Sequence, residues 1–267
     1  MPKDELFKEP TFFSEFNTGL NLDQYLTLFE AATEEQQLIG EASTAYLTDP
    51  SSAKRIHAFN PAAKIIIILR NPADRAYSLY NWMVQEGYEY ASSFRRALVL
   101  EEKRKNKKIP NYWEPEHYGN YMYFSSGLYY EQVKRYLDLF GNNVLVLKFD
   151  DLVSDLNSTY QEVCTFLGIQ PQVVTPMAAN PSKSVIIPAL QFLLRKLNHR
   201  FVRLRGLHRK PGVGKEERDL LLRLGQLSGK PRKLDPGLRK MLVEMYRHDL
   251  EKLSELTGLD VSDWLDS

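Results

Sequence analysis

The sequence predicts an α/β fold, in which helices cover a parallel β-sheet. Two short runs of β-branched and aliphatic residues, 64–70 and 144–148, have the composition of strands. The segments before and after the second run have the spacing of amphipathic helices. Strands separated by helices indicate a layered α/β fold whose sheet is parallel.

Length and composition exclude several classes of protein. The 267 residues are 43% hydrophobic and 26% charged, the balance of an ordinary globule with a sizeable core rather than of a fibre or a disulfide scaffold. The single cysteine, Cys164, cannot form an internal disulfide or a cysteine-based metal site. The longest aliphatic run, 65–69, is far shorter than the roughly 20 residues of a membrane helix. We therefore expect a cytoplasmic protein without a membrane span.

Positive charge is concentrated in one segment of the chain. Thirteen Lys and Arg residues lie between 195 and 233, against three acidic residues, so the segment carries +10 while the whole chain carries +1. An excess of this kind attracts anionic partners or substrates. A solvated helix face is the alternative, and we favour it for most of these positions.

The first strand is predicted at 64–70, from the run Lys-Ile-Ile-Ile-Ile-Leu-Arg. Its aliphatic residues do not alternate with polar ones, which is typical of a strand buried on both faces of a parallel sheet. Asn71 and Pro72 follow at once, as a helix N-cap and a proline at the first helical position. A helix is therefore expected from here to about Gly87.

A second strand is expected at 144–148, between two helices. The first helix spans about 126–140, and the second spans about 152–167 and ends at Gly168. The C-terminal third of the chain is predicted to be helical at about 188–203, 216–224 and 235–256, and the last of these helices opens with an Asp-Pro pair.

An aromatic stretch lies before the second strand, at 111–124. Aromatic rings bind sugar and ring faces well, so the stretch suits a loop that faces a substrate. Tyrosines that cover the core are an equally good interpretation. The only histidine that we consider as an alternative catalytic base lies here, and the stretch contains Tyr112, Trp113, Pro115, His117, Tyr118, Gly119, Tyr121, Tyr123 and Phe124.

Arg70 ends the first predicted strand, at the edge where ligands of open α/β sheets bind. Its guanidinium is a planar, permanently charged fork that suits phosphate oxygens. The helix that begins at Asn71 offers free N–H groups and the positive end of its dipole, and Ser78 lies two turns into it. These residues predict a phosphate site. The alternative is that Arg70 only ends the strand and Ser78 packs.

The segment NPAAKIIIILRNPADRAYSLY, residues 60–80, resembles the 3′-phosphate-binding strand and helix of sulfotransferases that use 3′-phosphoadenosine 5′-phosphosulfate (PAPS). The heparan sulfate and related carbohydrate sulfotransferases and their bacterial relatives are the most similar. The resemblance implies that Arg70 and Ser78 hold the 3′-phosphate. It also implies a P-loop-NTPase-like three-layer fold with a central parallel sheet flanked by helices, one domain over 1–267, and PAPS as co-substrate. No metal is expected, because the five histidines show no ligand spacing.

Other segments extend the resemblance over almost the whole chain. IGEASTAYL (39–47) resembles the family's segment before the binding strand, and 127–152 resembles its Gly-x-Tyr helix and the strand that follows. FLGI (166–169) and the segment 234–265 resemble later parts of the family's sequence.

The segment Lys-Glu-Pro-Thr-Phe-Phe at 8–13 resembles a KEPxFF-like segment of the family, whose glutamate is the proposed general base. The resemblance implies that Glu9 takes the proton of the acceptor hydroxyl, which is otherwise a poor nucleophile. An exposed carboxylate near the N-terminus is the alternative. Ala42 stands where animal members have a lysine after the glutamate that corresponds to Glu41, so that lysine's help is absent or relocated.

A loop of the GxxKxGTT kind, which binds the 5′-phosphosulfate in the family, has no counterpart in the sequence. We expect the N-terminal strand and this loop to be missing. The segment Gly212–Lys215 is similar, but no strand precedes it and Glu216 stands where Ser or Thr should follow, so we interpret it as a turn before a helix. Lys230 and Arg232 lie where relatives have a basic loop over the cofactor, and they are predicted to bind it.

Two functions of different classes follow. The first is a PAPS-dependent sulfotransferase acting on a hydroxyl or amine of a small-molecule or carbohydrate acceptor, with Glu9 as base and the nucleotide held by Arg70, Ser78, Lys230 and Arg232. The second is a catalytically impaired sulfotransferase-like protein that binds polyanions through 195–233. A nucleotide kinase is disfavoured because the sequence has no Walker loop, and no nucleic-acid partner is expected.

Overall fold

Two parallel strands from distant parts of the sequence lie at the centre of the fold. β1 (Ile65–Leu69) pairs with β2 (Val144–Lys148) in a register that sets Ile65 opposite Val144 and Leu69 opposite Lys148. The computed structural model describes residues 9–15, 19–106, 120–172, 184–185, 187–204, 226–227 and 233–266. A second pair of strands, β3 (Ser184–Val185) and β4 (Gln226–Leu227), is antiparallel.

Helices make up most of the remaining described chain. The α-helices are α1 (Leu22–Thr27), α2 (Ala45–Thr48), α3 (Ser52–Phe59), α4 (Pro72–Gln85), α5 (Phe94–Asn106), α6 (Tyr130–Phe140), α7 (Phe149–Ser154), α8 (Leu156–Leu167), α9 (Pro188–Leu204), α12 (Pro236–Thr257) and α13 (Ser262–Leu265). Two short 3₁₀ helices, η3 (Ser125–Gly127) and η4 (Gly141–Asn143), lie at the two ends of α6.

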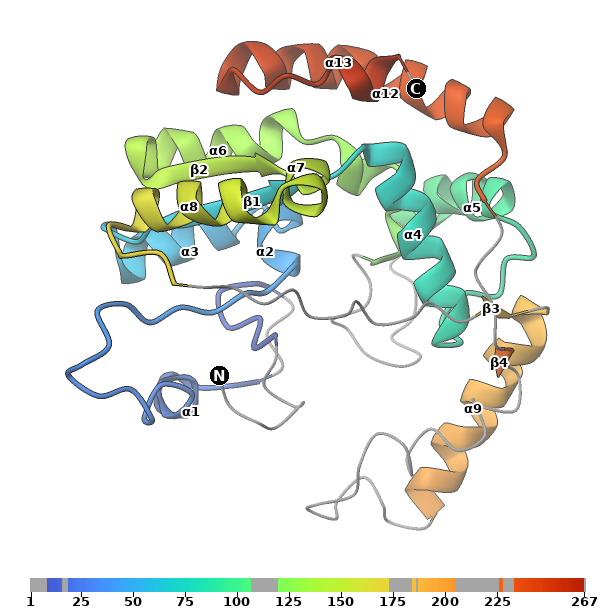
Figure 1. Ribbon diagram of the computed structural model, residues 1–267. Coiled ribbons are helices and arrows are strands. Elements are labelled where there is room, and N and C mark those ends of the chain that lie inside the picture. The colour runs from blue at the N-terminus through green and yellow to red at the C-terminus, as the bar shows by residue number, and fades with distance from the viewer. Residues whose placement is uncertain are drawn as a thin grey trace.

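The helices flank the parallel sheet, as predicted. α6 contacts both strands, and α12 in turn contacts α6 and α4, so α12 lies outermost and α6 lies between it and the strands (Figure 1). α8 contacts β2, and α3 contacts α6. The largest group of buried apolar side chains joins these layers and includes Ile67, Leu69, Ala76, Met83, Val133, Tyr136, Leu242, Tyr246 and Leu250.

Local capping signals place the helix ends where the sequence predicts them. Asn71 caps α4 and Pro72 begins it, and Asp235 caps α12 through a bond from the Leu238 amide. α8 ends at Gly168, whose φ of +77° is a conformation that glycine adopts without strain. The helix predicted at 216–224 lies outside the described residues.

One predicted helix is two. The segment expected as a single helix at 152–167 divides into α7 and α8 at Asp155, whose backbone is non-helical, with φ −141° and ψ 79°. Its carboxylate accepts the amide of Ser158 at 3.0 Å. The physical reason is that an Asp side chain competes for backbone N–H groups and so favours a cap over a helix interior.

The expectation that both faces of β1 are buried is wrong. Ile67 and Leu69 are buried, but Ile66 and Ile68 are 37% and 47% exposed. Alternate residues of a strand point to opposite faces, so the described helices cover one face of β1 and leave the other partly open. The unbroken aliphatic run 65–69 therefore indicated a strand correctly, but it did not indicate burial on both faces.

The described part of the aromatic stretch belongs to the core. The Tyr123 side chain is fully buried and its hydroxyl donates to Glu89 at 2.7 Å. Tyr121 donates to the carbonyl of Tyr88 at 2.8 Å, and the Phe124 ring stacks on Tyr246 with centroids 4.5 Å apart. Tyrosines that cover the core are thus the correct interpretation for 121–124, while 111–119, with His117, lies outside the described residues.

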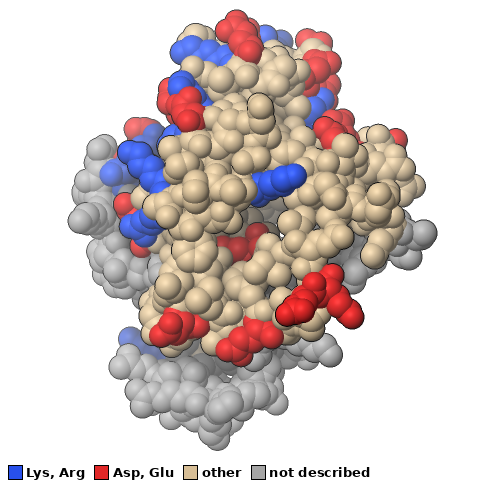
Figure 2. Space-filling model, turned by 90° about the vertical axis from the view of Figure 1, so that its left-hand side faces the viewer, with Lys and Arg blue, Asp and Glu red and all other residues tan. Residues whose placement is uncertain are grey.

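Charges of both signs are interspersed over the described surface on the face shown in Figure 2, and large uncharged areas separate them. Acidic atoms lie in a hollow near the middle of this face. Most of the basic segment 195–233 lies outside the described residues. Among the helices that the structure describes, none is long and apolar enough to cross a membrane.

The contact between Gly127 and Tyr246 makes a test of this packing. A Cβ atom on Gly127 would lie 2.8 Å from the Tyr246 hydroxyl and 3.0 Å from its ring. Because both residues are buried, we expect Gly127→Ala to lower the free energy of unfolding by about 1–3 kcal/mol, measured by urea denaturation. Gly40→Ala is the control, since nothing lies within 4 Å of its Cβ. Equal losses in the two variants would contradict the expectation.

Candidate functional site

Arg70 and Phe149 follow the paired ends of the two parallel strands. Because Leu69 pairs with Lys148, the next residue of each chain segment emerges at the same edge of the sheet. The Arg70 guanidinium lies over the Phe149 ring, with its Cζ atom 5.5 Å from the ring centroid. Both side chains are partly exposed. A guanidinium supported by an aromatic face keeps its N–H donors available for an anion.

The N-terminus of α4 does not offer the free N–H groups that we expected. The Asn71 side chain accepts the amides of Ala73 and Asp74, at 3.0 and 3.3 Å. Pro72 has no N–H group. The side-chain Nδ2 atom of Asn71 donates to the carbonyl of Trp264 at 3.3 Å, which fixes the capping side chain in place. The cap that begins the helix thus occupies the groups that would otherwise bind an anion. An anion bound here would therefore have to be held by side chains.

Ser78 is exposed on α4. The alternative interpretation, in which Ser78 packs in the interior, is therefore wrong. It lies seven residues after Asn71 and four after Asp74, which places all three on one face of the helix. The Asp74 carboxylate would repel an anion on this face. Arg239 of α12 compensates it, with Nε and Nη2 at 3.2 and 3.0 Å from the two carboxylate oxygens.

The short helix α13 borders this edge of the sheet. Its Trp264 indole donates to the carboxylate of Asp150 at 2.9 Å. Its Asp263 accepts from Lys148, the last residue of β2, at 2.7 Å. Together with the bond from Asn71 to the Trp264 carbonyl, these contacts tie the C-terminus to the residues that surround Arg70.

Tyr129 holds the backbone of Arg70. Its hydroxyl donates to the Arg70 carbonyl at 2.9 Å, and its side chain is buried. Burial raises the pKa of Tyr129, with the neighbouring arginines acting in the opposite direction. The hydroxyl therefore stays a proton donor at neutral pH, and the carbonyl of Arg70 keeps its partner.

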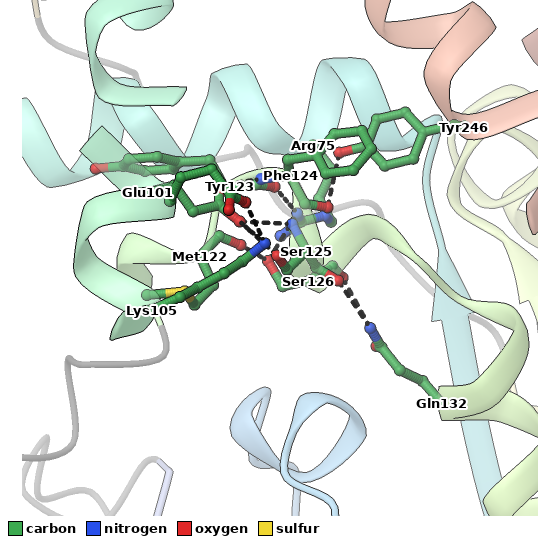
Figure 3. Close-up of polar contacts among 11 residues, drawn as sticks. Arg75, Glu101, Lys105, Met122, Tyr123, Phe124, Ser125, Ser126, Gln132 and Tyr246 are labelled. Carbon is green, nitrogen blue, oxygen red and sulfur yellow. Dashed lines mark hydrogen bonds and ion pairs between the residues drawn. The ribbon is translucent and has the colours of Figure 1, made fainter. Parts of the chain in front are cut away.

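A buried polar network fixes the segment just before α6 (Figure 3). Glu101 accepts the amides of Phe124 and Ser125 at 2.7 and 2.9 Å. Arg75 points inward and donates to the Tyr123 carbonyl at 2.6 Å and to the Ser126 hydroxyl at 2.9 Å. Arg75 is thus a structural residue. It anchors the turn that brings Tyr129 to Arg70.

The N-terminus of α6 is capped from another helix. The Asp249 carboxylate, on α12, accepts the amides of Tyr129 and Tyr130 at 2.6 and 3.2 Å. A negative charge at this position also favours the positive end of the helix dipole. Desolvation by burial raises the pKa of Asp249, and the two amide bonds act against that rise.

Glu9 is held by one residue of the segment 39–47. The amide and the hydroxyl of Thr44 donate to its Oε2 atom, at 3.2 and 2.7 Å. Glu9 is exposed, and its Oε1 atom has no hydrogen-bond partner among the residues that the structure describes. The carboxylate is therefore oriented through one oxygen while the other is available to take a proton.

Glu41, in the same segment as Thr44, accepts hydrogen bonds from three hydroxyl groups. Tyr46 and Ser43 donate to its two oxygens at 2.5 and 3.0 Å, and Tyr25 lies further away at 3.4 Å. Burial raises the pKa of Glu41, the hydroxyl bonds oppose that rise, and the charge of Glu9 adds to it.

Side chains at the start and in the middle of α6 bind the backbone next to Arg70 and next to the Glu9 segment. Tyr129, at its N-terminus, holds the carbonyl of Arg70, and Tyr136 donates to the carbonyl of Tyr46 at 2.7 Å. The neighbouring Arg135 donates to the carbonyl of Leu47 at 3.0 Å. Residues seven apart in a helix lie on the same face and about 10 Å apart along its axis. One helix therefore holds both the backbone of Arg70 and the segment that binds Glu9.

The structure places three of the five predicted site residues. Arg70 lies just before α4, Ser78 lies two turns into that helix, and Glu9 lies against the segment 39–47. Lys230 and Arg232 lie outside the described residues. No group of His, Cys, Asp and Glu residues that could hold a metal is present in the part of the chain that the structure describes.

Sequence reasoning missed the support for these residues. Phe149 received no role, although its place directly after the second strand, matching that of Arg70 after the first, was a signal. Tyr129 likewise received no role, yet its hydroxyl holds the Arg70 carbonyl. Thr44 and Tyr46 lie in the segment 39–47, but no local pattern shows that they reach back to Glu9 and Phe13.

Comparison with known proteins agrees with this arrangement. The family described as "Sulfotransferase domain" matches residues 3–185, which include Glu9, β1, α4, α6 and β2. The chain belongs to the sulfotransferase domain family. A sulfotransferase from Alicyclobacillus acidocaldarius has a similar structure, with a TM-score of 0.68 and 28% sequence identity over 96% of this chain and 85% of that one. The predicted P-loop-like α/β fold is confirmed by this likeness.

Two relatives differ in the acceptor that their names imply. The mouse bifunctional heparan sulfate N-deacetylase/N-sulfotransferase 4 is 27% identical over 175 residues, 64% of this chain and 19% of that protein. The guinea pig 3-alpha-hydroxysteroid sulfotransferase is 34% identical over 111 residues, 41% of this chain and 33% of that protein. The chain thus spans a third or less of the length of these relatives.

Asn71 follows β1, caps α4 and bonds to α13, and its substitution tests these connections. Asn71→Ala deletes the cap of α4 and the bond to the Trp264 carbonyl. We expect the free energy of unfolding to fall by about 1–2 kcal/mol, measured by urea denaturation. Asn21→Ala is the matched control, since Asn21 caps the exposed six-residue helix α1. A larger loss for Asn21→Ala than for Asn71→Ala would contradict this expectation.

Proposed function

We propose that the protein transfers the sulfuryl group of PAPS to a hydroxyl or amine of an acceptor, acting as a single sulfotransferase domain over 1–267. The acceptor oxygen or nitrogen attacks sulfur, and the bond from sulfur to the phosphate oxygen breaks. Adenosine 3′,5′-bisphosphate leaves, and Glu9 takes the proton of the acceptor. The observation that supports this best is that side chains of one helical segment hold both the backbone of Arg70, through Tyr129, and the segment 44–47 that binds Glu9, through Tyr136.

Arg70 and Ser78 are proposed to hold the 3′-phosphate. Arg70 contributes a charged donor fork whose flat face rests on Phe149. Ser78 contributes an exposed hydroxyl on the same face of α4. Lys230 and Arg232 stay in the proposal as cofactor-binding residues.

A carbohydrate is the acceptor that we propose first, with an amine or a hydroxyl as the nucleophile. The heparan sulfate N-sulfotransferases among the relatives support this choice, while the hydroxysteroid sulfotransferase supports a small-molecule hydroxyl. The cytoplasmic location follows from the single cysteine and is likewise proposed. The rival function, polyanion binding without transfer, depends on 195–233, whose larger part lies outside the described residues.

Nucleotide binding is the first test. Isothermal titration with adenosine 3′,5′-bisphosphate should detect binding to the wild-type chain. Because a charged hydrogen bond to phosphate is lost, Arg70→Ala should weaken the affinity by about 10- to 100-fold, and Ser78→Ala by about fivefold. Arg95→Ala is the control, since Arg95 is an exposed arginine of α5. Equal affinities in the Arg70 and Arg95 variants would exclude the proposed phosphate site.

Transfer of labelled sulfate from PAPS is the second test, with de-N-sulfated heparin and a 3α-hydroxysteroid as acceptors. Glu9→Gln removes the base and should lower kcat by about 100- to 10,000-fold. The affinity for adenosine 3′,5′-bisphosphate should not change. Glu15→Gln is the matched control, because Glu15 is an exposed glutamate six residues further along. Full activity of Glu9→Gln would rule out Glu9 as the base.

A further inference from the structure

The segment that carries Glu9 contains a strained residue. Thr11 has a φ of +49°, a left-handed conformation that is a genuine outlier for a β-branched side chain. Such a conformation persists only where surrounding contacts determine it. Thr11 is buried, and its carbonyl accepts both the amide and the hydroxyl of Ser14, at 3.0 and 3.1 Å. The backbone around Glu9 is therefore held in one shape by specific bonds.

Two hydroxyl oxygens from outside this segment accept backbone amides within it. The amide of Thr11 donates to the Ser43 hydroxyl at 3.1 Å, and the amide of Phe13 donates to the Tyr46 hydroxyl at 3.3 Å. A hydroxyl can accept a backbone amide only when its own proton points elsewhere. Each hydroxyl therefore needs an acceptor for its own hydrogen bond on the side away from the segment.

The Glu41 carboxylate accepts a hydrogen bond from each of these hydroxyls. Its Oε2 atom accepts from Ser43 at 3.0 Å and its Oε1 atom accepts from Tyr46 at 2.5 Å. An ionised carboxylate only accepts hydrogen bonds, so it directs each hydroxyl proton inward and leaves each oxygen facing the segment 11–13. Hydrogen bonds to a charged group are also stronger than neutral ones.

The same turn also holds the Glu9 side chain. Ser43 and Thr44 are neighbours, and Thr44 donates twice to the Glu9 carboxylate. Ser43 thus holds the backbone two residues after Glu9, while Thr44 holds its carboxylate. Both depend on the position of the segment 43–46, which α6 fixes through the carbonyls of Tyr46 and Leu47.

We propose that Glu41 is a positioning residue for the reaction. By orienting the hydroxyls of Ser43 and Tyr46, it clamps the segment 9–13 and so places the Glu9 carboxylate for proton transfer. This rests on the proposed function, in which Glu9 is the base. Glu41 itself does not touch the reacting atoms in this assignment.

The experiment compares Glu41→Gln with the wild type in the full chain. A glutamine amide has one acceptor oxygen and one donor nitrogen, so it can take the proton of one hydroxyl and not of the other. Hydrogen exchange followed by NMR should then become faster at the Thr11 or Phe13 amide. In the transfer assay with de-N-sulfated heparin and a 3α-hydroxysteroid, kcat should fall by about 10- to 100-fold while the KM for PAPS stays unchanged.

Three variants localise the effect. Ser43→Ala and Tyr46→Phe each remove one hydroxyl and should speed exchange only at the amide that it held, at Thr11 or at Phe13. Tyr160→Phe is the matched control, because the Tyr160 hydroxyl also accepts a backbone amide, that of Gln172, at 3.3 Å. It should change neither kcat nor the exchange of the segment 9–13.

The outcomes separate this proposal from the proposed function. Unchanged exchange at both amides in Glu41→Gln overturns the clamp, whether or not the protein transfers sulfate. Faster exchange with an unchanged kcat overturns the positioning role. If the wild type transfers no sulfate to either acceptor, the proposed function fails, and faster exchange in Glu41→Gln still supports the clamp on the segment 9–13.

Discussion

Two tyrosine hydroxyls on one face of α6 hold the two halves of the candidate site in place. Tyr129 and Tyr136 are both buried, and each donates to a backbone carbonyl of a distant segment. A buried hydroxyl left without a partner costs the free energy of its desolvation. These bonds are therefore expensive to break, and the carbonyls of Arg70 and Tyr46 keep a fixed relation to the helix. The site thus takes part of its geometry from α6, in addition to the segments that carry its side chains.

The position of α6 in turn depends on charges buried elsewhere. Asp249 caps its N-terminus from α12, and Glu101 on α5 accepts two amides of the turn that precedes it. Glu101 is buried and Asp249 is half-buried, and carboxylates removed from water are stable only when their hydrogen bonds are made. This network therefore helps to fix the start of α6, from which Tyr129 reaches the Arg70 carbonyl. Substitutions in it would change the site without altering any residue of the site.

The elements around Arg70 could be predicted from the sequence because their signals are local. The aliphatic run of β1 and the Asn71–Pro72 pair of α4 act within a few residues of the structure they produce. The open face of β1 and the contacts of Tyr129 could not be predicted in this way. They depend on which distant segments pack nearby, and the Tyr129 bond joins residues 59 positions apart. The resemblance named Glu9, but the hydroxyls that hold it come from about 35 residues further along.

The closed N-terminus of α4 changes how an anion can be recognised here. Free amides at a helix start bind phosphate through the backbone and the dipole. In this chain Asn71 occupies those amides, so a bound phosphate has to lie along the side of the helix instead. In the proposed site the phosphate would meet Ser78 on that side, one turn beyond Asp74, whose charge Arg239 balances. A serine two turns into the helix is remote from the terminus, so its proposed role as an anion ligand depends on Arg70 as the main partner.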